Sequence, residues 1–450
     1  MIFVEDKFEF QNFLIEYRKH TNLIYVRLSD DDKHVMNNRI SFVYVKSKTN
    51  EWVINVNNGD GLGIKIEALE QLLDTQYPQL IFNYKTILQI LPFTKGFDID
   101  LAKFIEYGYH DIELGDNGLN QFYKSKFKGE PYLNDSIPMI KQLELIQQYV
   151  SKFSFNMVVN KNSIKYIDDV TKAFSYIESN GLKVDGDYVL NYNPVHLTKD
   201  NYVYTQYNLM TSTLRPSNRY GGVNYAALKK DTGERKAFIS RFDGGELISC
   251  DFEAYHPRLL MDIIYQTKLN SKIDMKEMKW IADFYGSGLD FYTWIGKQMG
   301  IDDRNEIKTL IFQNLYGGIR SELLHIPYFK EIQHLTDLLS ETIVKNKAIF
   351  THLYHIQFGI ERLEPITPAK VLNYYIQAYE TERNINKILK IKEKLEGKQT
   401  KLILYTYDAF VFDVYPSEKQ YLYNEIIPIL RGGHGRYEVK TTVGKNYDEL

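Results

Sequence analysis

The chain has 450 residues, enough for two or three domains that each bury a core of their own. Its formal net charge of −3 excludes a basic field over the whole molecule, so any contact with nucleic acid requires a local patch. The single cysteine, Cys250, excludes an internal disulfide framework, and we expect a reducing, cytoplasmic environment. An acidic start and the lack of a long apolar run argue against a signal peptide and a membrane partner.

The first 130 residues have the pattern of a small α/β unit. A polar, turn-rich and basic stretch at 115–131 marks its end, so we place the first domain at 1–130. The predicted elements are strands at Leu23–Leu28, Ile40–Val45, Trp52–Val56 and Leu80–Phe82, and helices at Ile66–Leu73 and Leu101–Tyr107.

The next segment, 131–200, has mainly helical periodicity, with helices expected in 137–153 and 164–181. In the third segment, 201–450, strands and helices alternate. This last segment contains the stretches whose residues carry chemistry.

An acidic residue follows an apolar strand in the third segment. Leu247–Cys250 leads directly to Asp251, and Pro257 and the apolar positions after it predict a helix. A carboxylate at the end of a buried strand is costly unless a cation or several donors meet it. A divalent metal ion and an ordinary helix cap both do so, and Asp251 alone leaves the two interpretations open.

A helix is predicted at Arg304–Gly317, where Arg304, Lys308, Phe312 and Tyr316 recur every four residues and share one face. Cations bind phosphate oxygens and aromatic rings stack on bases, so this face suits a nucleotide. An amphipathic helix with aromatic residues in its core gives the same pattern. The other stretches therefore decide its meaning.

Residues 401–414 predict a strand, a tight turn and a second strand, with Asp408 in the turn. An aspartate at a hairpin tip is a common turn residue in its own right. If Asp251 and Asp408 end strands of one sheet, however, the pair can hold two Mg²⁺ ions. Mg²⁺ needs few protein carboxylates beside water and substrate phosphates.

Taken in order, these stretches resemble motifs A, B and C of family A DNA polymerases, the group of bacterial DNA polymerase I. Residues 246–260 are similar to motif A, 304–317 keep the motif B spacing R-x3-K-x3-F-x3-Y-G, and 402–414 resemble motif C. Weaker similarities lie at 211–228, 289–300, 373–384 and 437–450. The resemblance covers about 191–450. It implies an α/β (α+β) right-hand polymerase with palm and fingers in 201–450 and a reduced helical thumb in 131–200.

The resemblance also assigns roles to single residues. Catalysis and metal binding fall on Asp251, Asp408, Lys308 and the carbonyl of Phe252, with two Mg²⁺ ions as the cofactor. Nucleotide binding falls on Arg304, Lys308, Phe312, Tyr316 and His256. Contact with primer-template DNA falls on Arg215, Arg258, Asn373, Gln377 and Tyr407.

Three positions depart from the family pattern. His256 stands where the family has a glutamate that blocks a 2′-hydroxyl and bonds the motif B tyrosine. Tyr407 and Ala409 replace the His and Glu of the motif C sequence H-D-E. The resemblance implies that the change at His256 leaves the selection of deoxyribose open. It implies that Ala409 removes an accessory charge near the metals and that Tyr407 alters a contact to the primer end.

In this family a ribonuclease H-like 3′–5′ exonuclease often precedes the polymerase. Here Arg27, Leu28 and Ser29 occupy the expected D-x-E positions, and Asn83 is present without the aspartate of the second motif. Two-metal hydrolysis needs several converging carboxylates. We therefore expect a degenerate domain that retains the scaffold without the activity.

The sequence as a whole predicts a template-directed DNA polymerase that adds dNTPs to a primer, of phage or plasmid type. We expect a monomer, with room for a processivity or replisome partner. A single-subunit RNA polymerase and a non-catalytic nucleic-acid-binding protein with the same fold stay open as alternatives. A lysine-rich stretch at 387–401 is either a phosphate-contacting patch or a solvated helix face.

Overall fold

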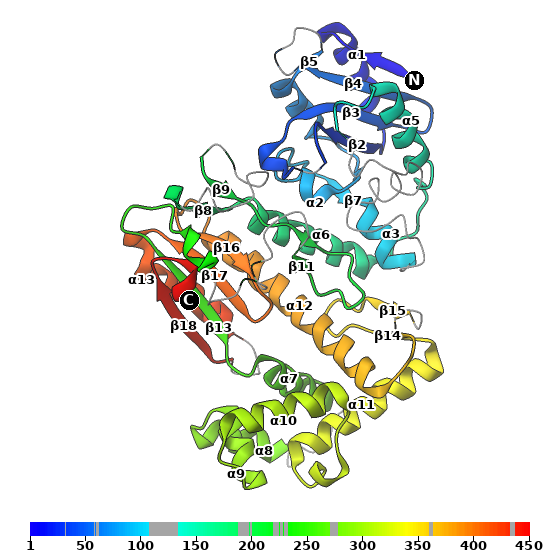
Figure 1. Cartoon of the computed structure of the whole chain (residues 1–450). Coiled ribbons are helices and arrows are strands. Elements are labelled where there is room, and N and C mark those ends of the chain that lie inside the picture. The colour runs from blue at the N-terminus through cyan, green and yellow to red at the C-terminus, as the bar shows by residue number, and fades with distance from the viewer. Residues whose placement is uncertain are drawn as a thin grey trace.

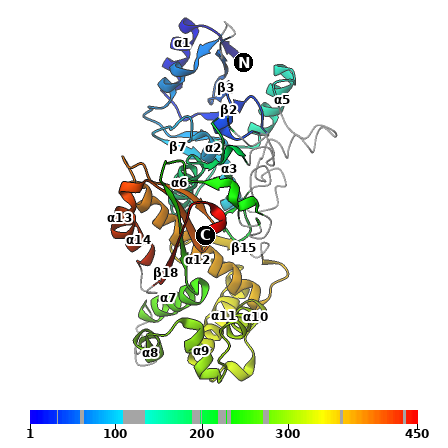
Figure 2. The same cartoon turned by 60° about the vertical axis from the view of Figure 1, so that its left-hand side comes forward.

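The computed structural model shows three regions arranged in a row (Figure 1; Figure 2). A sheet with covering helices lies at the N-terminal end, a second sheet lies in the middle, and a group of helices lies at the far end. The structure describes residues 1–31, 33–57, 59, 63–107, 134–187, 198, 200–218, 225, 228, 233–270, 278–359, 363–432 and 437–450.

The N-terminal region is built on one mixed sheet in the order β1-β4-β3-β2-β6-β7, with β5 beside β4. The strands β2, β3 and β4 are antiparallel, whereas β6 and β7 run parallel to β2. This is the ribonuclease H-like arrangement that we expected. The elements are β1 Ile2–Val4, α1 Lys7–Tyr17, β2 Leu23–Leu28, β3 Ile40–Lys46, β4 Glu51–Asn57, β5 Ile64–Lys65, β6 Gln79–Ile81, α2 Tyr84–Ile87, β7 Gly96–Asp98 and α3 Ile99–Tyr107.

The four strands predicted in this region are present, because their alternating or continuous apolar residues are buried. The helix expected at Ile66–Leu73 is a 3₁₀ helix, Ile66–Leu72. The first helix, α1, was not predicted; Asp6 caps it by accepting a hydrogen bond from the Glu9 amide at 2.8 Å.

The segment expected to form the thumb packs against two different cores. Helix α5, Met139–Val150, shares a core with the N-terminal sheet, where Ile146 and Tyr149 pack with Phe42 and Phe82. Helix α6, Lys161–Glu178, packs in the largest core of the described residues, with the second sheet and the far helices. The boundary expected at residue 130 lies outside the described residues.

The second large sheet is antiparallel throughout, in the order β16-β17-β13-β18. Its strands come from distant parts of the chain, so it brings the candidate motifs together. The strands are β13 Glu246–Phe252, β16 Lys401–Tyr405, β17 Ala409–Val414 and β18 Val439–Gly444. The short strands nearby are β8 Leu182–Val184, β9 Tyr202–Val203, β10 Tyr207–Asn208, β11 Ser217–Asn218 and β12 Phe238–Ile239.

Helices form the far end, and one long helix, α12, runs from this end back beneath the second sheet (Figure 1). Asp303 caps the start of α10 by accepting hydrogen bonds from the amides of Asn305 and Glu306. The helix ends at Gly317, and the next residue, Gly318, has a φ of 101°, which favours glycine. The elements are α7 Tyr255–Asn270, α8 Lys279–Ser287, α9 Phe291–Met299, α10 Arg304–Gly317, α11 Pro327–Asn346, β14 Ala348–Phe350, β15 Gln357–Gly359, α12 Pro368–Lys394, α13 Lys419–Tyr421 and α14 Ile427–Arg431.

Across the described part of the chain, none of the helices is both long and apolar enough to span a bilayer. The lysine-rich stretch belongs to the C-terminal half of α12 and the turn after it. Lys387 is not available to a phosphate, because its ammonium group is buried and donates to the Leu430 carbonyl at 2.6 Å.

Candidate active site

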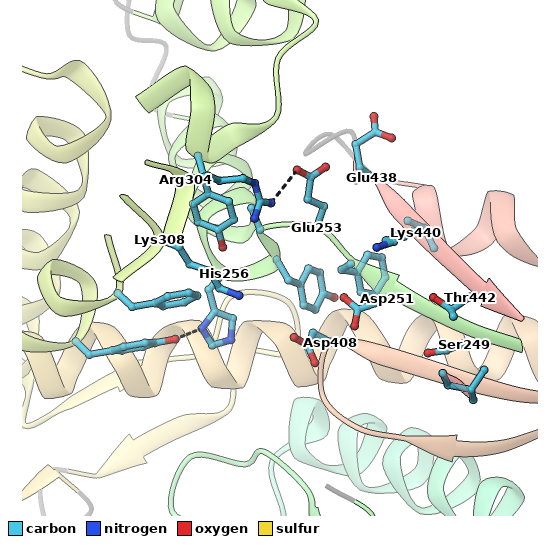
Figure 3. A pocket seen from close by; sticks show the side chains of 18 of the residues that line it. Ser249, Asp251, Glu253, His256, Arg304, Lys308, Asp408, Glu438, Lys440 and Thr442 are labelled. Atoms are coloured by element: carbon cyan, nitrogen blue, oxygen red, sulfur yellow. Dashed lines mark hydrogen bonds and ion pairs between the residues drawn. The ribbon is translucent and has the colours of Figure 1, made fainter. Parts of the chain in front are cut away.

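A cavity of about 820 Å³ lies between the second sheet and helices α7 and α10 (Figure 3). Its walls come from segments that are far apart in the sequence. The lining residues are Arg215, Ser249, Asp251, Phe252, Glu253, Ala254, Tyr255, His256, Tyr292, Arg304, Lys308, Phe312, Tyr316, Asp408, Glu438, Val439, Lys440, Thr442 and Leu450.

Asp251 and Asp408 lie next to each other at the floor of the cavity (Figure 3). In the ladder of β13 and β17, Asp251 pairs with Ala409, and the Phe252 amide donates to the Asp408 carbonyl at 2.9 Å. Tyr407 has φ of 66°, and this turn places Asp408 directly before β17. Asp251 lies inside β13 rather than at the residue before α7, so the helix-cap interpretation does not describe its position.

The pKa of each carboxylate is raised. Burial, and then the charge of Asp408, raise the pKa of Asp251 to about 6. Burial, and then the charge of Glu380, raise the pKa of Asp408. Two adjacent acids whose charged forms are disfavoured form a site that a cation stabilises.

Helix α10 presents its four-residue stripe to the same cavity, as the spacing predicts (Figure 3). The opposite face is buried through Ile307, Ile311 and Leu315. The rings of Phe312 and Tyr316 stack with centroids 5.7 Å apart and an angle of 8° between their planes. The helix therefore offers a flat aromatic surface beside a cationic end.

The two cations of α10 differ in their surroundings. Arg304 contacts Asp290 at 3.2 Å and Glu253 at 3.8 Å, and its guanidinium lies over the Tyr292 ring. These contacts hold Arg304 at the rim. Lys308 is exposed and points into the cavity toward Asp251, whose pKa its charge lowers (Figure 3).

His256 connects α10 to a buried acid that the sequence did not reveal. Its Nδ1 is hydrogen-bonded to the Tyr316 hydroxyl, and its Nε2 lies 2.9 Å from Glu380 Oε2. Arg215 forms an ion pair with the same carboxylate at 3.2 Å. The only sequence signal for Glu380 is an acid in the apolar stripe of a long helix, where an unpaired charge is costly.

Two more lining residues were also missed: Lys440 on β18, and Glu438, directly before this strand begins. Lys440 pairs with Asp251 across the β13–β18 ladder, so both side chains leave the same face of the sheet. Glu438 lies two residues before it. The final strand was recognised from its similarity to the family, but strand pairing is what places Lys440 beside Asp251.

Of the residues expected to contact DNA, some line the cavity and others do not. Arg215 lines the cavity, and its guanidinium lies 3.8 Å from the centroid of the Tyr407 ring. Asn373 and Gln377 lie half-buried on α12 and bond to each other at 2.7 Å, outside the cavity lining. Arg258 lies outside the cavity lining: it is 3% exposed and donates to the Glu253 carbonyl, and its contact with DNA stays a prediction.

Two buried acidic side chains in the N-terminal region hold main-chain amides of the fold. Asp98 and Asp100 are buried and accept hydrogen bonds from the amides of Lys85 and Asn83 at 3.1 and 2.7 Å. Arg27 is fully buried at the position expected for a catalytic acid, where it donates to Gln142 at 2.6 Å. This arrangement gives the described residues no exposed acidic cluster in this region.

No group of three or more His, Cys, Asp or Glu side chains suited to a metal ion occurs among the described residues. Asp251 and Asp408 alone would thus supply the carboxylates of a metal site, and such a pair fits Mg²⁺, which takes its other ligands from water and phosphate. Phe252 contributes main chain to this floor, while its side chain is buried against Tyr255.

The fold of the chain matches that of a DNA polymerase domain. The chain is similar to a solved structure described as the POL domain of Pol1 from M. smegmatis in complex with DNA primer-template and dNTP. The TM-score is 0.66, the sequence identity is 12%, and the match covers 100% of both chains. No protein-family model and no curated protein sequence matches the chain.

Proposed function

We propose that the chain is a template-directed DNA polymerase of the family A type that extends a primer with dNTPs. One observation carries this proposal: a polymerase-like fold brings Asp251 and Asp408 into one cavity with Lys308, Phe312 and Tyr316. A cavity with adjacent acids, a free cation and an aromatic stack suits a metal-bound nucleoside triphosphate better than a neutral ligand.

The role that we propose for each residue follows from its surroundings in the cavity. Asp251 and Asp408 would hold two Mg²⁺ ions, with the Phe252 carbonyl as a further ligand. When bound, such ions activate the primer hydroxyl and stabilise charge on the phosphates. Arg304 and Lys308 would contact the triphosphate.

The aromatic residues would orient the nucleotide. Phe312 would pack on its sugar and base, and Tyr316 would mark the place where the templating base enters. His256 would fill the space beside the sugar.

In the proposed reaction the primer 3′-oxygen forms a bond to the α-phosphorus of the dNTP, and the bond from that phosphorus to the bridging oxygen breaks. The primer hydroxyl loses its proton, and pyrophosphate leaves. Lys308 is exposed in the cavity and carries a proton that it can donate to the leaving group. The proton of the primer hydroxyl passes to water, and all other atoms of the substrates are accounted for in the extended primer and pyrophosphate.

We assign the palm and fingers to 201–450, the reduced thumb to 131–200 and an inactive exonuclease-like domain to 1–130. The packing of α5 on the N-terminal sheet places at least part of the second segment with the first. Arg215, Tyr407, Asn373 and Gln377 would face the primer-template. A role in phage or plasmid replication, as a monomer, completes the proposal.

A primer-extension assay with Mg²⁺ tests the proposal and its alternatives. We expect extension from dNTPs on a primed DNA template. Preferred extension from rNTPs would favour an RNA polymerase, for which His256 in place of glutamate leaves room. Binding of primer-template without extension by either nucleotide pool would favour the non-catalytic alternative and would overturn the proposal.

A further inference from the structure

Glu380 is a fully buried acid in the middle of α12 whose partners both line the cavity. Its Oε2 lies 2.9 Å from His256 Nε2 and 3.2 Å from Arg215 Nε. Its Oε1 accepts a hydrogen bond from Arg215 Nη2 at 3.3 Å. The Oε2 atom of Glu380 is thus shared between His256 and Arg215, which belong to different walls of the cavity.

On the side of the cavity proposed to hold the nucleotide, His256 links Glu380 to the stacked rings of α10. A carboxylate accepts hydrogen bonds, so Nε2 of His256 donates to Glu380, while Nδ1 is hydrogen-bonded to the Tyr316 hydroxyl. Burial raises the pKa of Tyr316 to about 12. Tyr316 stacks on Phe312, so Glu380 is linked through His256 to the aromatic surface proposed to hold the nucleotide.

On the opposite side the contact continues to the turn that carries Asp408. The Arg215 guanidinium lies on the Tyr407 ring, and the Tyr407 carbonyl accepts from Asn384 at 3.2 Å. Tyr407 has a positive φ, an uncommon conformation for a non-glycine residue that surrounding contacts must hold, and Asp408 follows it directly. This is the side proposed to hold the primer end.

We propose that Glu380 is a positioning residue that couples the primer side of the cavity, through Arg215, to the nucleotide side, through His256 and Tyr316. This inference rests on the proposed polymerase function. The physical reason is the shared oxygen: when nucleic acid displaces Arg215, the buried carboxylate loses its only nearby guanidinium among the described contacts and draws more strongly on His256. The hydrogen bond between Tyr316 and His256 then changes as well.

A purely structural role makes a different prediction. Glu382, two residues further along α12, is also fully buried, but it bonds to Thr351 and to the amides of Leu353 and Tyr354, away from the cavity. Loss of either acid disturbs the packing of α12. Only loss of Glu380 removes the link between Arg215 and His256, so Glu382→Gln is a matched control.

The test is a double-mutant cycle on single-nucleotide insertion, with Arg215→Lys and His256→Gln. We expect the two changes to be non-additive in kcat/KM for dNTP by about fivefold or more, because they share one partner. In the Glu380→Gln background we expect them to become additive. In the Glu382→Gln background the non-additivity should persist. Additive effects in the otherwise unchanged protein would overturn the proposal, without need of any variant at Glu380.

A second measurement requires no catalysis. The ¹⁵N resonances of the His256 ring report which nitrogen carries the proton. We expect addition of a primer-template duplex to shift them in the unchanged protein and to leave them in place in Glu380→Gln. If the protein binds the duplex but extends no primer, the proposed function fails, while this shift still decides the coupling. Equal shifts in both proteins would overturn the coupling.

Discussion

Asp251 and Lys440 face each other across the β13–β18 ladder, on the side of the sheet that forms the floor of the cavity. The Lys440 charge lowers the pKa of Asp251, opposing burial and Asp408, which raise it. Ala409 pairs with Asp251 from the other side, at the position where the related motif has a second acid. The row Ala409, Asp251, Lys440 therefore carries less negative charge than the motif predicts.

This row leads to the first prediction. We expect Lys440→Gln to weaken primer-template binding and to lower the slope of log affinity against log salt by about one, because one fewer cation neutralises a phosphate. Binding measured by fluorescence anisotropy across a salt series checks this. Lys445→Gln, which removes an exposed cation that pairs with Glu246 at 3.8 Å and does not line the cavity, is the control and should have a smaller effect. An unchanged slope in Lys440→Gln would mean that Lys440 does not contact the DNA.

Lys308 gives the second prediction. Since it points into the cavity and Arg304 is held by two acids, we expect Lys308→Gln to raise KM for dNTP by about ten- to a hundredfold, the range of one or two charge-assisted hydrogen bonds. Steady-state insertion kinetics measure it. Lys330→Gln, on the exposed surface of α11, serves as the control. A KM like that of the unchanged protein would assign the triphosphate to another cation.

The third prediction concerns stability and pH. Burial raises the pKa of Glu382 to about 7 from a usual 4.5, so the native state holds a proton that the unfolded state has already lost at neutral pH. The free energy of unfolding should therefore fall as pH rises from about 4.5 to 7, by up to about 3 kcal/mol from this group, and then level off.

Urea unfolding at pH 5 and pH 8 measures this dependence. Glu382→Gln should reduce it, whereas Glu393→Gln, an exposed acid of the same helix, should not. Asp100, whose pKa burial and then Asp98 raise to about 7, leaves part of the slope in place. An identical slope in Glu382→Gln and the unchanged protein would contradict the assignment.

The fourth prediction concerns the N-terminal region. Because Arg27 is buried where an acid is expected and Asp98 and Asp100 hold main-chain amides, we expect no shortening of a 5′-labelled single strand in Mg²⁺. Gel electrophoresis over a time course checks this. Shortening that Asp98→Asn abolishes would reveal a nuclease site that the described residues do not show.

Much of this architecture could be predicted from sequence because it depends on local patterns. The strands with continuous apolar residues and the helix Arg304–Gly317 agree with their patterns. The spacing of Arg304, Lys308, Phe312 and Tyr316 also predicts their common face. Asp251 and Asp408 were chosen because an acid at the end of an apolar strand needs a partner.

The parts that could not be predicted depend on tertiary pairing. No local sequence pattern distinguishes Lys440 from other lysines, and only the antiparallel register of β18 brings it beside Asp251. Glu380 was missed because its partners come from positions more than a hundred residues earlier in the chain. The burial of Arg258 was not predicted, because resemblance gives a position in a motif but not whether the side chain is buried.

The central claim is that Asp251 and Asp408 form the metal-binding floor of a polymerase site, and one measurement tests it most directly. Single-turnover primer extension in Mg²⁺ compares the unchanged protein with Asp251→Asn, Asp408→Asn and the exposed control Asp243→Asn. We predict that each of the first two slows extension by about a thousandfold or more while primer-template binding persists, and that the control does not. Extension that survives both changes at its normal rate would contradict the account.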